Sequence, residues 1–70
     1  MTIEPGMAVV LMDEQRTTEG RVVTVGSSGT VVGYEGERYV VEVDDHATGQ
    51  RLTVVTDRWN VRRLAPRLVR

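Results

Sequence analysis

The chain has 70 residues, ten acidic and nine basic, for a formal net charge of −1, and it contains no cysteine. A chain this short buries only about 60% of the surface that its unfolded form exposes, which limits it to one small domain. The lack of cysteine excludes disulfides and thiolate zinc sites, and no apolar run approaches the roughly 20 residues of a membrane-spanning helix. We therefore expect a cytoplasmic protein with no membrane association, stabilised by a well-packed sheet, by self-association or by docking on a larger assembly.

The composition favours β-structure. Fourteen residues are valine, whose branched side chain prefers a pleated surface, whereas helix formers are scarce and lysine is absent. Glycine and other turn residues recur at short intervals and divide the chain into strand-length pieces.

The first part of the chain predicts one strand and a long connection. Residues 7–12 (MAVVLM) form a short apolar run after Pro5-Gly6, which favours a strand. The polar residues 13–20 (DEQRTTEG) predict a long loop or an irregular hairpin, with residues 21–25 as its returning leg. Residues 26–29 (GSSG) predict a turn, with glycines available wherever a positive φ is required.

The second part predicts two hairpins and a short last strand. Residues 30–34 (TVVGY) and 38–43 (RYVVEV) flank Glu35-Gly36-Glu37, a good hairpin signal. Alternation places Tyr39, Val41 and Val43 on one face, which we expect to face the core. The segments that follow are predicted as a turn (residues 44–50), a strand (51–56), one helical turn (56–59) and a last strand (60–64) that ends before Pro66.

Together these elements predict an all-β fold, a small five-stranded antiparallel barrel with one short helical turn before the last strand. The sequence resembles the SH3-like barrel superfamily, in particular small bacterial SH3-like domains of unassigned function. The resemblance is carried by Pro5-Gly6, "GSSGTVVGY" (residues 26–34), "YVVEVDD" (39–45) and "WNVRRL" (59–64). It implies an SH3-like barrel over residues 1–64, followed by a short Arg-rich tail over residues 65–70, and it specifies the fold better than the function.

Three functional classes share this fold. KOW-like RNA-binding modules carry basic residues around the hairpin, where this chain has Glu35, Glu37, Glu42 and two aspartates. Polyproline-binding SH3 domains use several groove aromatics, and this chain has two tyrosines and one tryptophan in all. The type II dihydrofolate reductases line an oligomeric pore with a segment that is replaced here by "LTVV" (residues 52–55), so their activity is not implied.

Charge is distributed unevenly along the chain. Residues 1–57 hold ten acids and four arginines, a net of −6, and residues 58–70 hold five arginines and no acid, a net of +5. This asymmetry indicates an acidic partner for the C-terminal segment. The candidate binding residues are Tyr34, Trp59, Arg58, Arg62, Arg63, Arg67 and Arg70.

Trp59 has two interpretations that the sequence leaves open. A tryptophan beside the last strand of a small barrel belongs either in the core or on the surface near Tyr34, where it would anchor an interface.

Catalytic and metal chemistry find little support. Asp44-Asp45-His46 is the one cluster with metal-like chemistry, but adjacent turn residues rarely point at one centre, so we expect a solvated turn and neither metal nor cofactor. With no thiol and a single histidine, we expect no enzyme. The sequence predicts a non-catalytic interaction module that docks on a protein partner through its loops and its Arg-rich C-terminal segment. A nucleic-acid-binding KOW-like module that uses the C-terminal arginines is the alternative, and a homo-oligomer is left open.

Overall fold

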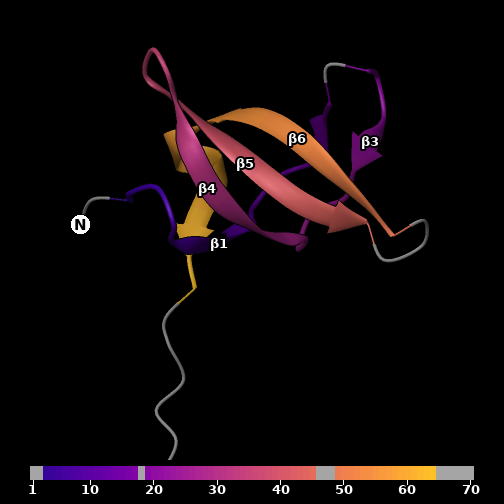
Figure 1. Cartoon of the computed structure of the whole chain (residues 1–70), viewed down its shortest axis with the longest axis horizontal. Coiled ribbons are helices and arrows are strands. Elements are labelled where there is room, and N and C mark those ends of the chain that lie inside the picture. The colour runs from indigo at the N-terminus through magenta and orange to yellow at the C-terminus, as the bar shows by residue number, and fades with distance from the viewer. Residues whose placement is uncertain (1–2, 18, 46–48, 65–70) are drawn as a thin grey trace, which may run out of the picture.

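The computed structural model describes residues 3–17, 19–45 and 49–64 and is all-β (Figure 1). Five strands form one antiparallel sheet in the order β6-β5-β4-β1-β7, and two short strands, β2 and β3, form a second sheet. The elements in chain order are β1 (Ala8–Leu11), β2 (Gln15–Arg16), β3 (Val22–Val23), β4 (Ser28–Glu35), β5 (Arg38–Asp45), β6 (Gln50–Asp57), the 3-10 turn η1 (Arg58–Asn60) and β7 (Val61–Arg63). The prediction of an all-β chain with a five-stranded antiparallel sheet is confirmed.

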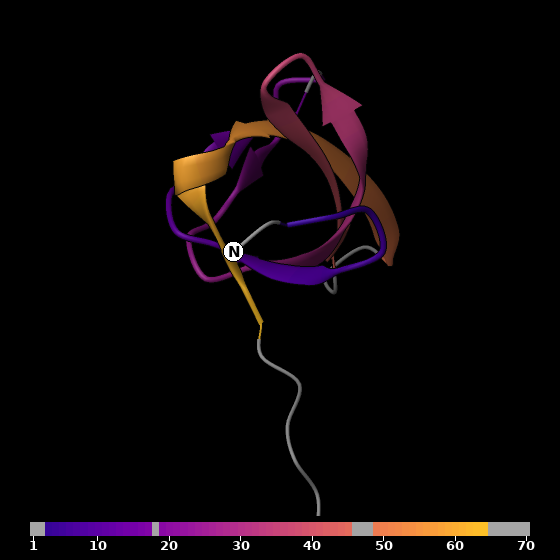
Figure 2. The ribbon, with the colours of Figure 1, turned by 90° about the vertical axis from the view of Figure 1, so that its left-hand side faces the viewer.

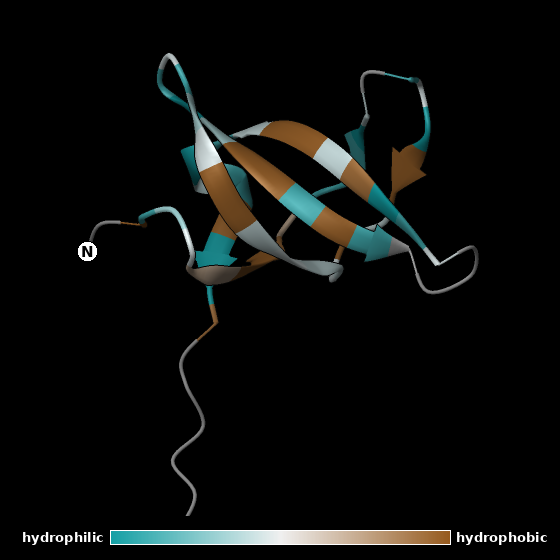
Figure 3. Cartoon of the chain, viewed as in Figure 1, coloured by the Kyte–Doolittle hydropathy of each residue, from teal (hydrophilic) through white to brown (hydrophobic). Residues whose placement is uncertain are grey.

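The sheet coils around a core made almost entirely of valine. Figure 2 shows the strands arranged around a common interior, and Figure 3 shows apolar and polar residues alternating along β5 and β6. Tyr39 packs against this core together with Ile3 and Leu52, so the predicted inward face of β5 is confirmed. The buried apolar side chains are Val9, Leu11, Val23, Val31, Val41, Val43, Val54 and Val61.

The turn predicted over residues 26–29 is wrong in its second half, because Ser28 and Gly29 belong to β4. Gly26 supplies the positive φ of the turn, at 89°, whereas Gly29 does not have a positive φ. Gly29 is required for a different reason. A Cβ atom built on it would lie against the carbonyl oxygen of Glu42 and 2.9 Å from Cγ1 of Val41. Its missing side chain therefore lets β4 approach β5 closely.

A β-bulge in β4 sets the position of Tyr34. Val31 pairs with Val41, but the next pair joins Gly33 to Val40, so Val32 is one extra residue on β4. A one-residue shift moves every following side chain to the other face of the strand. The shift therefore aligns Tyr34 with Tyr39, and their ring centroids are 5.7 Å apart.

The long connection between β1 and β4 is an irregular hairpin, as predicted, in which β2 pairs with β3. Thr17 is buried, and its Oγ1 accepts hydrogen bonds from the backbone N–H groups of Glu19 (3.3 Å) and Arg21 (3.1 Å). Nη1 of Arg21 donates to Oε1 of Gln50 at 2.6 Å, which joins the hairpin to the start of β6.

The last elements turn the chain back onto β1. The predicted helical turn is present as η1, whereas Thr56 is the buried penultimate residue of β6. β7 then pairs with β1, and the N–H of Met12 donates to the carbonyl oxygen of Asn60 at 2.7 Å. Within the three described stretches, no helix is long and apolar enough to cross a bilayer. The predicted tail over residues 65–70 lies outside the described residues.

Candidate functional site

A groove of about 470 Å³ lies where η1 and β7 meet the N-terminal segment and β5. It draws on three separate parts of the chain: the N-terminal segment, β5 and the continuous stretch of η1 and β7. The lining residues are Ile3, Tyr39, Arg58, Trp59, Val61, Arg62 and Arg63. The structure thus brings together four of the predicted binding residues, one tryptophan and three arginines.

The local structure explains which of these side chains reach solvent. No residue of the three-residue turn η1 is buried, so Arg58 and Trp59 both point away from the core. In β7, Val61 is buried while Arg62 and Arg63 are exposed. The buried and half-buried apolar residues therefore supply the inner part of the groove, and the arginines and the indole supply its outer part.

Trp59 lies on the surface, with 71% of the residue exposed, so its interpretation as a core residue is wrong. The physical reason is the size of the interior, which β-branched valines already fill. Tyr39 lines the groove together with Trp59, whereas Tyr34 does not.

Tyr34 supports the groove without lining it. Its ring contacts Tyr39, and its hydroxyl donates a hydrogen bond of 2.9 Å to the carbonyl oxygen of Ile3. Both of these partners line the groove, so Tyr34 positions the N-terminal segment against it. Of the other predicted binding residues, Arg67 and Arg70 lie outside the described residues.

The groove keeps its positive charge. Among the described residues, neither Arg58 nor Arg62 forms an ion pair. The acid that precedes them, Asp57, pairs instead with Arg38, with 3.2 Å between Oδ1 and Nε. No aspartate or glutamate follows Asp57 in the sequence.

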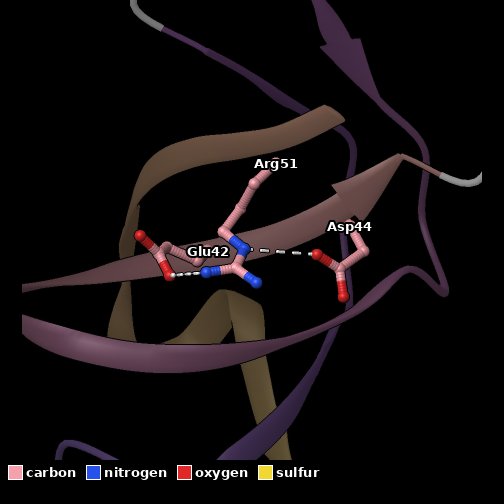
Figure 4. A network of polar contacts seen from close by, with 3 residues as sticks. All are labelled: Glu42, Asp44 and Arg51. Carbon is pink, nitrogen blue, oxygen red and sulfur yellow. Dashed lines mark hydrogen bonds and ion pairs between the residues drawn. The ribbon is translucent and has the colours of Figure 1, made fainter. Parts of the chain in front are cut away.

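The outer face of β5 and β6 is different, because its charges are matched (Figure 4). Arg51 lies between two carboxylates of β5, with Nη1 3.6 Å from Oε1 of Glu42 and Nε 3.4 Å from Oδ1 of Asp44. Asp44 belongs to the cluster considered for metal binding, and here it pairs with an arginine, while His46 lies outside the described residues. Over the described stretches, no group of three or more His, Cys, Asp or Glu side chains is placed to hold a metal ion.

Three groove residues, Ile3, Tyr39 and Val61, were not predicted as binding residues from the sequence. Tyr39 was assigned to the core, and it both packs on the core and lines the groove. Ile3 carries no local signal, because its place depends on the tertiary hydrogen bond from Tyr34. The glycine inside β4 was a usable signal, since an isolated glycine in a strand pattern indicates a bulge, and the bulge places Tyr34.

Comparison of the chain with protein-family models, with curated proteins and with solved structures found no match. Inference about function therefore starts from the chemistry of the groove. Its seven lining residues include cations, aromatic rings and aliphatic side chains, and none is a carboxylate, a thiol or an imidazole.

Proposed function

We propose that this domain is a non-catalytic interaction module with an SH3-like barrel fold, which docks on a protein partner through the groove between η1 and β7. The observation that carries the proposal is the exposure of Trp59 inside a groove that also holds three arginines. Tryptophan and arginine are the residue types most enriched at the energetic centres of protein interfaces.

The topology supports the SH3-like fold. The long connection after β1, the tight hairpins of β4–β5 and β5–β6 and the single 3-10 turn before β7 are the features that the resemblance implies. Pairing of β1 with β7, the first and last strands of the main sheet in chain order, also brings distant parts of the chain together.

The groove's chemistry supports binding rather than catalysis. General acid–base and nucleophilic catalysis most often use histidine, carboxylate or thiol groups. The lining residues supply none of these; they are three arginines, two aliphatic side chains, one indole and the phenol of Tyr39. The cytoplasmic location inferred from the sequence stays a prediction.

Charge favours a protein partner over a nucleic acid. Binding along a phosphate backbone uses a basic track, whereas here the basic groove adjoins an acidic hairpin with exposed Glu35 and Glu37. The apolar part of the groove has no function in phosphate binding, but it suits the side chains of a protein. Arg67 and Arg70 would add contacts beside the groove, in line with the role proposed for the C-terminal segment.

The proposal is tested with the immobilised full chain. Proteins captured from a lysate, with and without nuclease treatment, are identified, purified and titrated against the domain by calorimetry. We expect a purified partner to bind the wild type and to lose affinity with Trp59→Ala, while Val25→Ala, at a site 62% exposed outside the groove, binds normally. Partners that bind Trp59→Ala as tightly as wild type, or bound material removed by nuclease, would overturn it.

A further inference from the structure

We infer that the partner presents an extended acidic segment in which carboxylates flank an apolar side chain. In this inference, which rests on the proposed docking function, the carboxylates bind Arg58 and Arg62 and the apolar side chain packs against Trp59. Three features of the groove indicate the chemistry of this segment.

The first feature is the positive charge of two arginines that form no ion pair among the described residues. Arg38 and Arg51 have carboxylates within ion-pair distance, whereas Arg58 and Arg62 have none among the described residues. Guanidinium groups bind carboxylates through two parallel hydrogen bonds, which makes an acidic side chain the most specific protein group for these positions.

The second feature is apolar surface beside the charge. Ile3 and Tyr39 are half-buried and Val61 is buried. Trp59 of η1 lines the same groove and is exposed. A purely acidic ligand would leave this surface in water, so burial of an aliphatic or aromatic ligand side chain contributes a separate part of the affinity.

The third feature is the shape of the groove. All three residues of β7 line the groove, so the groove runs along the length of this strand. A strand advances about 3.3 Å per residue, so β7 is matched in length by about three or four residues of an extended ligand. Such a ligand alternates its side chains, which suits carboxylates on either side of an apolar residue.

A single-stranded nucleic acid is the competing occupant, since a base stacks on tryptophan and phosphate binds arginine. The acidic tip of the β4–β5 hairpin opposes it. Glu35 and Glu37 are exposed there, and the same hairpin carries Tyr39 into the groove. A nucleic acid carries a phosphate at every nucleotide, so these glutamates repel it more strongly than they repel a short peptide with a carboxylate at every second residue.

The experiment uses the fluorescence of Trp59, the chain's single tryptophan, as a direct report from the groove. The probes are a capped eight-residue peptide of alternating glutamate and leucine, its glutamine and lysine counterparts, and an eight-nucleotide oligothymidine. We expect the glutamate peptide to shift the emission to shorter wavelength and to saturate. The glutamine peptide should bind about tenfold more weakly or worse, because it cannot form the charge-assisted hydrogen bonds.

Matched variants test the two arginines. Arg58→Gln and Arg62→Gln should each weaken binding of the glutamate peptide by about tenfold and flatten its salt dependence. Arg16→Gln is the control, because Arg16 is exposed on β2, in the small sheet outside the groove, and its loss should leave the affinity unchanged. Thermal melts followed by far-ultraviolet circular dichroism establish that each variant is folded.

The outcomes separate the two proposals. Equal binding of the glutamate and glutamine peptides, or no emission change at millimolar glutamate peptide, overturns the inference of an acidic segment. The proposed docking function is still supported in that case if a purified protein partner binds the wild type and loses affinity with Trp59→Ala. Tight oligothymidine binding that depends on Arg58 and Arg62 overturns both.

Discussion

On the outer face of β5 and β6, Arg38 faces Asp57 across the strands and Arg51 lies between two carboxylates, whereas Arg58 and Arg62 at the groove have no acidic partner among the described residues. The chain uses the same residue type in both places. On the sheet, Arg38–Asp57 and Arg51–Asp44 join residues in register, and a slip of one position would separate them, so they favour one alignment of the strands. Exposed pairs of this kind contribute only about 0.2–1 kcal/mol each, so they add specificity more than stability.

Arg58 and Arg62, by contrast, form no such pair among the described residues. They follow the last acid of the sequence, on η1 and β7, which contribute one buried valine and the backbone pairing with β1 to the domain. The comparison therefore separates charges that align the domain from charges that are available to a partner. Four substitutions and one control test the sheet and the groove.

The largest effect is expected for Gly29→Ala, which pushes β4 away from the strand that carries Glu42. The added Cβ would meet the Glu42 carbonyl oxygen and lie 2.9–3.0 Å from two valine side chains. The carbonyl oxygen belongs to the backbone, so it cannot rotate away as a side chain could. We expect a loss of about 2–3 kcal/mol in the free energy of unfolding, measured by urea denaturation.

Gly33→Ala is its matched control in the same strand. A Cβ there would have no heavy atom within 4 Å, and Gly33 has no positive φ. A similar loss of stability in both variants would show that strand glycine as such, rather than close approach at Gly29, is what the fold requires.

Trp59→Ala should affect binding and leave the fold intact. The residue is 71% exposed, so the free energy of unfolding should change by less than about 0.5 kcal/mol. Binding of the glutamate peptide should fall by about 2 kcal/mol, which is the loss typical of an interface anchor. Calorimetric titration measures the second quantity, and a large drop in melting temperature would contradict the separation between groove and core.

Arg51→Gln should cost stability only, and only a little. It leaves Glu42 and Asp44 on the same face of β5 without their shared cation. We expect a loss of about 0.5–1 kcal/mol in the free energy of unfolding, which shrinks in 0.5 M salt because the pairs are exposed. Peptide binding in the groove should match that of the wild type.

The smallest effect on stability is expected for Arg62→Gln. With no ion pair to lose among the described residues, the variant should unfold within about 0.5 kcal/mol of the wild type at both low and high salt. If it is destabilised as much as Arg51→Gln is, the groove arginines have a structural function and the comparison fails.

The sequence predicted the elements that depend on local pattern. Glycine between two glutamates specified the β4–β5 hairpin, and the alternation of Tyr39, Val41 and Val43 specified its inward face. It did not predict features that depend on contacts between strands. The role of Gly29 depends on how closely β5 approaches, and the alignment of Tyr34 depends on the bulge at Val32.

The candidate site follows the same rule. The excess of arginine after Asp57 indicated where positive charge would gather, and the groove contains three of those arginines. The exposure of Trp59 could not be predicted, because it depends on whether the valines of six strands fill the interior without it. Ile3 is held at the groove by the hydrogen bond from the Tyr34 hydroxyl, which lies 31 residues away in the sequence, so no local sequence pattern predicts its position.

The chain has three aromatic residues, and all of them lie at one end of the sheet, where Tyr34 contacts Tyr39 and Tyr39 shares the groove with Trp59. The aliphatic interior is consequently silent in the near-ultraviolet, and every aromatic optical signal comes from the groove end. Melting curves recorded with the aromatic bands and with the peptide band therefore report on different parts of the domain. Superimposable curves would mean that this end opens together with the strands, and an earlier aromatic transition would mean that it opens first.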